Sequence, residues 1–223
     1  MTKPKIHQII NRAFILAGLM SMLALTWNVH HIRSNSESNT LEATKSVEDK
    51  GSYTIGNNPT DLNKTYFEEL KKAVKNNESN EIVPALVKTF ISEYFTWSNK
   101  DGNYDVGGMN YIYSDLQKNF YQFSLDGFYR DFDAAMKKYG RKDLLEVSDV
   151  QTQSIQSAES LEVVTNTETK EKVSLPSFQI KATWNYAGHA MPSSLVMKEA
   201  TFMVVNHNGR YEIASVEYGG QHE

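Results

Sequence analysis

Two aspartates, Asp101 and Asp105, and the six histidines are the side chains of this 223-residue chain whose positions we weigh for acid–base or metal chemistry. Asp101 and Asp105 follow the longest segment of helical apolar periodicity. Two carboxylates there could act as general acid and base if an apolar pocket and a third polar group shifted a pKa. The sequence identifies neither, and Asp101-Gly102 is a common turn pair. Turn formation is therefore the expected role of both aspartates.

The histidines give no stronger indication of a site. His189 lies in Asn185-Tyr-Ala-Gly-His-Ala-Met-Pro192, which reads as a loop between strands, and His207 lies in a predicted hairpin turn. An exposed turn histidine is the expected state of each, with a catalytic base as the alternative. His30 and His31 are adjacent, but a metal site there would need a third ligand from a polar segment.

Other reactive chemistries lack the residues that they need. The chain has no cysteine, which excludes disulfides, cysteine-ligated zinc, iron–sulfur clusters and a thiol nucleophile. No glycine-rich phosphate loop, nucleophile elbow or HExxH motif occurs. We therefore predict no catalytic, cofactor-binding or metal-binding residue, no cofactor, and a protein that is not an enzyme.

Residues 13–29, AFILAGLMSMLALTWNV, contain no charge. As a helix they would span about 26 Å, slightly less than a hydrocarbon core of about 30 Å, and Trp27 suits a membrane interface. A buried core helix would need a larger domain to enclose it. A cleaved signal peptide would need a small-residue cleavage site, which residues 26–29 lack. The segment is predicted to be a retained transmembrane anchor.

The charges around this segment predict its orientation. Lys3, Lys5 and Arg12 precede the span, residues 1–33 contain no acid, and Arg33 weakens the asymmetry without reversing it. The positive-inside bias places residues 1–12 in the cytoplasm and the C-terminal part outside the cell membrane. Residues 34–223 carry a net charge of −8, so direct nucleic-acid binding is not expected.

A polar segment separates the anchor from the folded part. Residues 34–64 are rich in Ser, Asn, Thr and Glu and have no consistent apolar period. They offer too little apolar surface to offset the entropy of ordering. We predict a flexible stalk over residues 30–64, with a short helix around Leu41–Asp49 as the alternative.

Apolar spacing predicts helices in the first half of residues 65–220. A short amphipathic helix covers Tyr66 to Val74, and seven apolar residues from Val83 to Phe95 fall on one helical face, with Pro84 in the first turn. A third helix is expected from Asn110 through Phe120. A fourth is expected from a Ser124 cap to a stop at Gly140.

After Arg141 the apolar period changes from 3.6 to 2, which predicts strands. Asn206-His-Asn-Gly209 between the last two is a strong hairpin signal. Helices followed by antiparallel strands indicate an α+β domain. The expected strands are 147–155, 161–164, 178–184, 198–205 and 211–218. The expected inward residues of the sheet are Phe178, Ile180, Trp184, Phe202 and Val204.

This layout of one span, a stalk, helices and a closing hairpin resembles the bitopic inner-membrane assembly factor of type IV secretion and conjugation systems, in its Gram-positive form. The nearest approach to a motif is Tyr94-Phe95-Thr96-Trp97 followed by Asp101-Gly102. The resemblance implies a nuclear transport factor 2-like (cystatin-like) domain with helices on a curved antiparallel sheet. It also implies a structural channel subunit that binds itself and other channel proteins. That family offers no catalytic residue to carry over.

Two classes of function follow. The first is a membrane-anchored assembly subunit of a DNA-transfer or secretion channel, whose surplus tyrosines could form protein contacts. The second is an extracellular small-ligand-binding or enzymatic cone-fold domain on a membrane anchor, because the same fold hosts both kinds of protein. An enzyme would need acidic or histidine side chains converging on the concave face of the sheet, where the expected residues are apolar.

Overall fold

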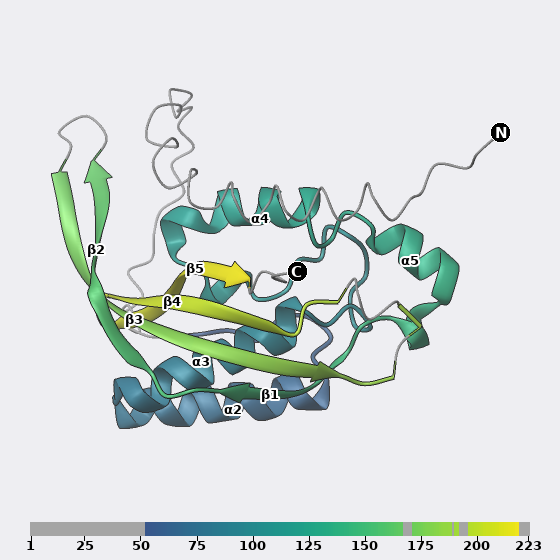
Figure 1. The fold of residues 1–223 in the computed structure, drawn as a ribbon, viewed down its shortest axis with the longest axis horizontal. Coiled ribbons are helices and arrows are strands. Elements are labelled where there is room, and N and C mark those ends of the chain that lie inside the picture. The colour runs from purple at the N-terminus through teal and green to yellow at the C-terminus, as the bar shows by residue number, and fades with distance from the viewer. Residues whose placement is uncertain (1–51, 167–170, 189, 192–195, 219–223) are drawn as a thin grey trace, which may run out of the picture.

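The computed structural model describes residues 52–166, 171–188, 190–191 and 196–218. Within them, four α-helices pack against a curved, open antiparallel sheet, as expected for an α+β domain (Figure 1). The helices are α2 (Asp61–Asn76), α3 (Ser79–Tyr94), α4 (Gln117–Asp126) and α5 (Phe132–Tyr139). The strands are β1 (Val147–Thr152), β2 (Gln156–Asn166), β3 (Glu171–Tyr186), β4 (Glu199–His207) and β5 (Arg210–Tyr218).

The predicted cytoplasmic segment 1–12, the anchor 13–29 and stalk residues 30–51 lie outside the described residues. Within the described ranges, no helix combines the length and the apolar character that a membrane span requires.

The sheet is organised around β3. The strand order is β1-β3-β4-β5, and β2 also pairs with β3. The 16-residue β3 pairs through residues 182–186 with β1 and through residues 171–179 with β2, so β1 and β2 follow one another along the same edge. Ile180, Ala182 and Trp184 are buried, and the Asn208-Gly209 turn joins β4 to β5 with positive φ at both residues, as the sequence predicts.

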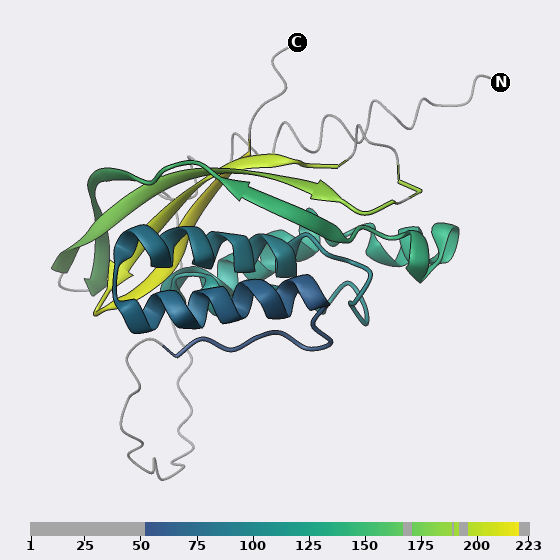
Figure 2. The same ribbon diagram turned by 90° about the horizontal axis from the view of Figure 1, so that it is seen from below.

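The first two helices form a pair beneath the sheet (Figure 2). Thr60 and Asn63 cap α2 reciprocally: Thr60 Oγ1 accepts from Asn63 N at 3.2 Å, and Asn63 Oδ1 accepts from Thr60 N at 2.9 Å. Helix α3 begins at Ser79, so Pro84 lies inside it and not in the first turn as the periodicity suggested. The helix starts earlier because the backbone N–H groups of Glu81 and Ile82 donate to Glu78 O, which adds a turn ahead of the apolar face.

The expected helix from Asn110 through Phe120 is confirmed only from Gln117, where α4 begins. Ahead of it lie two 3₁₀ turns, η1 (Met109–Tyr111) and η2 (Ser114–Leu116). Ile112 forms a parallel bridge with Ile213, and Tyr113 N donates to Ile213 O at 2.9 Å. Pairing with the edge of β5 thus replaces the helical hydrogen bonds.

The fourth expected helix is also revised. Ser124 does not cap a helix; it is buried inside α4, where its hydroxyl donates to Phe120 O at 2.7 Å. Helix α5 starts at Phe132, and Gly140 ends it as predicted.

The folded domain begins earlier than residue 65. Residues 52–60, called the strap below, run along the helix pair before α2 starts at Asp61 (Figure 2). Tyr53 is buried in the main core, and its hydroxyl donates to Tyr211 O at 2.7 Å. Residues 52–64 are therefore part of the domain and not of a flexible stalk.

Candidate functional site

Asp101 and Asp105, for which a turn role is predicted and acid–base chemistry is the alternative, lie together in one loop. Asp105 Oδ2 accepts from Asp101 N at 3.1 Å, and Asp101 Oδ2 accepts from Asn58 Nδ2 at 3.5 Å. Asp101 is exposed and Asp105 half-buried. These contacts support the turn role, because the carboxylates bind the backbone and the strap.

The predicted histidines are not brought together with the aspartates. His207 lies in the β4–β5 turn, where its ring contacts Tyr113 and its Nδ1 lies 3.7 Å from Glu212 Oε2. His189, His30 and His31 lie outside the described residues. In the part of the chain that the structure describes, no group of acidic or histidine side chains could hold a metal ion.

Aromatic side chains fill the space between α3 and the sheet. Phe90 contacts Phe202 with ring centroids 5.9 Å apart, and Phe95 stacks on Trp184 at 4.5 Å. Tyr94 is fully buried, and burial raises its pKa to about 12, so its hydroxyl stays protonated and bonds Ser124 Oγ at 3.2 Å. The concave face, where a ligand site was the alternative, is thus packed with side chains.

The strap is held at its start by Arg210. This guanidinium donates to Ser52 O, and to Asn110 O at 2.7 Å, and it lies 4.2 Å from the centre of the Tyr53 ring. Its Nε donates to Glu212 Oε1 at 3.1 Å. One side chain on β5 therefore fixes the point at which the preceding chain enters the domain.

The middle of the strap rests on a buried carboxylate. Glu93 is only 3% exposed, and its Oε1 accepts from Tyr111 Oη at 2.8 Å and from Gly56 N at 3.3 Å. Burial raises the pKa of Glu93, against the lowering effect of these hydrogen bonds and of Lys100. Burial likewise lowers the pKa of Lys100, which Asp105 and Glu93 oppose.

This cluster stabilises the fold and does not form an open site. Lys100 is 2% exposed, and a Cβ at Gly107 would lie 2.8 Å from its Nζ. Sequence reasoning missed Glu93, Lys100 and Arg210. Their spacing in the sequence does not mark these three residues. For the strap itself, the signal is Tyr53 and Ile55, two apolar residues inside a polar segment.

We predict that the folded domain loses stability as pH rises because Glu93 ionises, and that Glu93→Gln makes this loss smaller. Because the folded-state pKa of Glu93 is raised, the folded chain binds this proton to higher pH than the unfolded chain. The free energy of unfolding therefore falls as pH rises from the ordinary carboxyl value of 4.5 towards the raised one. Glutamine keeps an acceptor oxygen for Tyr111 and Gly56 without a charge.

Thermal melting between pH 4.5 and 8 tests this prediction. The difference in melting temperature, variant minus wild type, should become more positive as pH rises. Glu217→Gln, which alters an exposed carboxylate on β5, is the control and should follow the wild-type profile. A difference for Glu93→Gln that does not change with pH would contradict the assignment.

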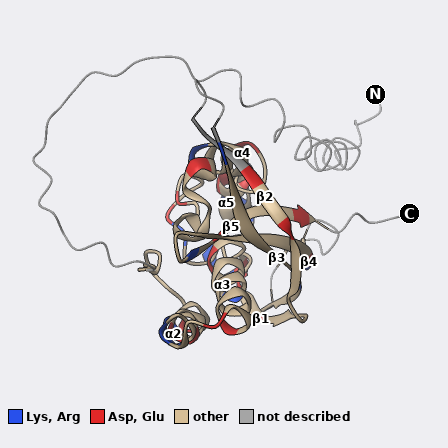
Figure 3. Ribbon diagram, turned by 90° about the vertical axis from the view of Figure 1, so that its left-hand side faces the viewer, with Lys and Arg blue, Asp and Glu red and all other residues tan. Residues whose placement is uncertain are grey.

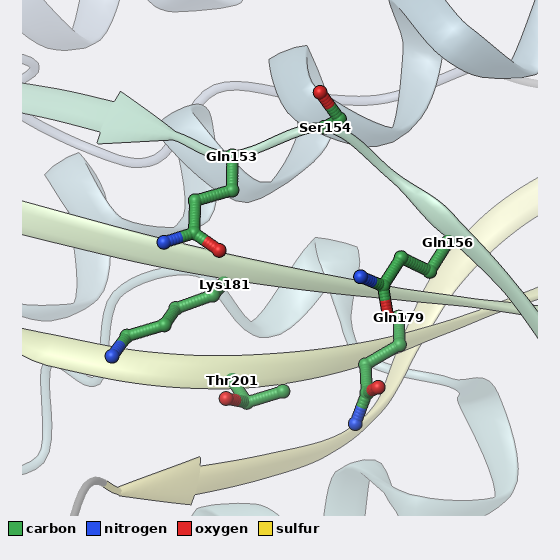
Figure 4. A pocket seen from close by; sticks show the side chains of 6 residues that line it. All are labelled: Gln153, Ser154, Gln156, Gln179, Lys181 and Thr201. Carbon is green, nitrogen blue, oxygen red and sulfur yellow. The ribbon is translucent and has the colours of Figure 1, made fainter.

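A polar depression lies where the chain passes from β1 to β2 (Figure 4). Its side chains come from that connection, from the start of β2, and from β3 and β4. They are Gln153, Ser154, Gln156, Gln179, Lys181 and Thr201. Lys181 pairs with Glu199 at 3.0 Å. The lining residues of β3 and β4 alternate with the buried Ile180 and Phe202, so the depression is on the face of the sheet opposite α3.

Most of the tyrosines that could have formed a protein interface are in the core. Tyr94, Tyr111, Tyr113 and Tyr129 are at most 3% exposed. Among the described residues, the exposed large hydrophobic side chains are Tyr104 at 64%, Val173 at 40% and Phe123 at 38%. An aromatic interface is therefore limited to few positions.

Comparisons of the chain with protein-family models, with curated proteins and with solved structures find no match.

Proposed function

We propose that this protein is a membrane-anchored structural subunit of a type IV secretion or conjugation channel. In this proposal residues 13–29 cross the membrane once and the α+β domain lies outside the cytoplasm. The domain acts by binding other copies of itself and other channel subunits. It has no catalytic step and makes no direct contact with nucleic acid.

The observation that carries the proposal is the packed concave face of the sheet. A small-ligand site on this face would need open space, whereas here Phe90 packs on Phe202 and Phe95 stacks on Trp184. With this face filled by aromatic side chains, the outer surface of the described domain is what remains for partners. This favours binding of macromolecules over chemistry on a small molecule.

The strap supports an anchored role. Arg210 and Glu93 bind the strap backbone at two separate points, so the chain that follows the predicted span enters the domain at a fixed place. A tether of this kind keeps each anchored domain close to one membrane surface. Such restriction lowers the entropic cost of assembling several copies.

We further propose that the fold is nuclear transport factor 2-like. The order of elements, the α2–α3 pair under the sheet and the bent β3 strand support this assignment. The alternative, a small-ligand-binding or enzymatic domain on an anchor, would use the depression beside Gln153 and Lys181. That depression has no aromatic or acidic lining residue, which favours the structural role.

Complementation of a gene deletion tests the proposed function. Deletion should abolish conjugative transfer, and the wild-type gene should restore it. Asp101→Ala, Asp105→Ala and His189→Ala should also restore transfer, since no catalytic step depends on them. Loss of transfer in one of these variants, with folding, membrane level and binding to partner copies all unchanged, would favour the enzymatic alternative.

A further inference from the structure

One end of the domain lies far from the point where the chain enters. The strap begins beside Arg210, passes Glu93, and reaches Asp101 and Asn99 through Asn58. Six extended residues cover about 20 Å. The end reached in this way contains residues 97–108 and the α5 region 132–143, and is called the distal pole (Figures 1 and 2). Trp97 and Phe132 join its two parts, with ring centroids 5.4 Å apart.

The distal pole has an acidic half and a basic half side by side. The acidic half holds Asp101, Tyr104 and Asp105 around the buried Lys100, and the basic half holds Lys137, Lys138, Arg141 and Lys142. Arg141 connects them, because its Nη1 donates to Lys100 O at 2.7 Å and to Ser98 O at 3.0 Å. Helix α2, which begins beside this pole at Asp61 and runs away from it, shows both signs of charge interspersed along its length (Figure 3).

The cations of the basic half are available to a partner. Lys137, Lys138, Arg141 and Lys142 are exposed, and within the described residues none of them has a carboxylate oxygen within 4 Å. Lys138 lies over the Tyr139 ring at 4.7 Å. The acids nearest in sequence are Asp143, which is exposed beside Lys142, and Asp133 in the first turn of α5. The segment 137–143 thus carries four cations and one carboxylate.

Tyr104 is an ordered aromatic side chain in the middle of the acidic half. It is 64% exposed, the highest value among the large hydrophobic residues described. Its ring packs on Gly102, where a Cβ would come within 2.5 Å of Cε1, and its carbonyl accepts from Tyr121 Oη at 3.1 Å. A tyrosine already held in place loses little entropy on binding, which is the property of a contact residue.

We propose that the distal pole pairs with the distal pole of a second copy of this chain about a two-fold axis. Under two-fold symmetry the acidic half of each copy faces the basic half of the other, so one surface is complementary to itself. Tyr104 then meets Lys137 and Lys138 of the second copy, where an aromatic face and an ammonium group attract each other. This inference rests on the proposed function in one respect: both domains lie on the same side of one membrane.

Cross-linking of the full chain in membranes tests this pairing, because the chain contains no cysteine and single cysteines give an unambiguous result. Two differently tagged copies are expressed together, one with Tyr104→Cys and the other with Lys137→Cys, and treated with a short thiol cross-linker. We expect a mixed dimer that decreases as salt rises. Lys72→Cys on α2, an exposed site away from the pole, should give only background when paired with Tyr104→Cys.

Charge reversal provides the decisive comparison. Lys138→Glu with Lys142→Glu should reduce the cross-link to background, and so should Asp101→Lys. Combining the two reversals on both copies should restore it, since acidic and basic halves are then exchanged. Lys72→Glu with Lys75→Glu on α2 is the matched control and should leave it unchanged. Within the described residues neither Lys138 nor Lys142 forms an ion pair, and Lys138 lies over the Tyr139 ring, so we expect their reversal to preserve the fold, which thermal melting of the variant checks.

A cross-link that survives reversal of the basic half, or that equals the Lys72→Cys background, would overturn the two-fold pairing. The transfer assay tests the proposed function, and the cross-link tests the pairing, so the two can fail independently. Intact transfer with no cross-link would contradict this inference alone, whereas a strong cross-link in a strain whose transfer never depends on the gene would contradict the proposed function alone.

Discussion

A copy that lacks residues 1–33 and is secreted through an unrelated cleavable signal should fail to restore transfer in the deletion strain. The reason is concentration. Holding domains in one membrane raises their effective concentration, and such linkage strengthens weak contacts by about 10²–10⁴-fold. The exposed aromatic side chains available for contact are few, so individual contacts between domains are expected to be weak. Transfer frequency measured by mating gives the result.

The matched control replaces residues 1–33 with an unrelated single span of the same orientation. It should restore transfer, because the account requires a tether and not a particular span sequence. Immunoblotting and limited proteolysis would verify that both proteins are present and folded. Full transfer with the secreted, anchorless domain would contradict the anchored role.

Gly107→Ala should destabilise the domain by about 3 kcal/mol or more. A Cβ at this position would lie 2.1 Å from the carbonyl oxygen of Glu93, which belongs to the α3 backbone and cannot move without disturbing the helix. The added Cβ would also lie 2.8 Å from Lys100 Nζ. Gly107 N also donates to Tyr129 Oη at 3.1 Å, so displacement of the loop would break a buried hydrogen bond.

Gly188→Ala is the control for this substitution. No heavy atom lies within 4 Å of a Cβ built at Gly188, and its φ is not positive. It should change the free energy of unfolding by less than about 0.5 kcal/mol. Urea unfolding, followed by the fluorescence of the buried Trp97 and Trp184, measures both. Equal stability of the two variants would contradict the close contact between the 100–108 loop and α3.

Local patterns predicted those elements whose burial is set by their own periodicity. The apolar face from Val83 to Phe95 marked α3, and the alternation of Ile180, Ala182 and Trp184 marked β3. The Asn208-Gly209 turn was predictable because both residues tolerate positive φ. The α+β class followed from the order of these elements.

Tertiary contacts decided what the sequence could not show. The segment after Gly108 has helical spacing, yet Ile112 pairs with β5 because the exposed edge of that strand offers hydrogen bonds. The strap is polar in composition, but Arg210 and Glu93 bind its backbone. Every residue has these backbone groups, so the sequence does not indicate which of them are bound. Burial of Glu93 and Lys100 likewise depends on elements distant in the chain.

Protease accessibility, which shows on which side of the membrane the domain lies, most directly tests whether the protein is anchored with its domain outside the cytoplasm. Protease is added to intact cells from which the wall has been removed, and the chain is followed with tags at both ends. We expect that the C-terminal tag and the domain are lost while the N-terminal tag and a fragment containing residues 13–29 persist. Full protection of the domain until the membrane is permeabilised would contradict the account.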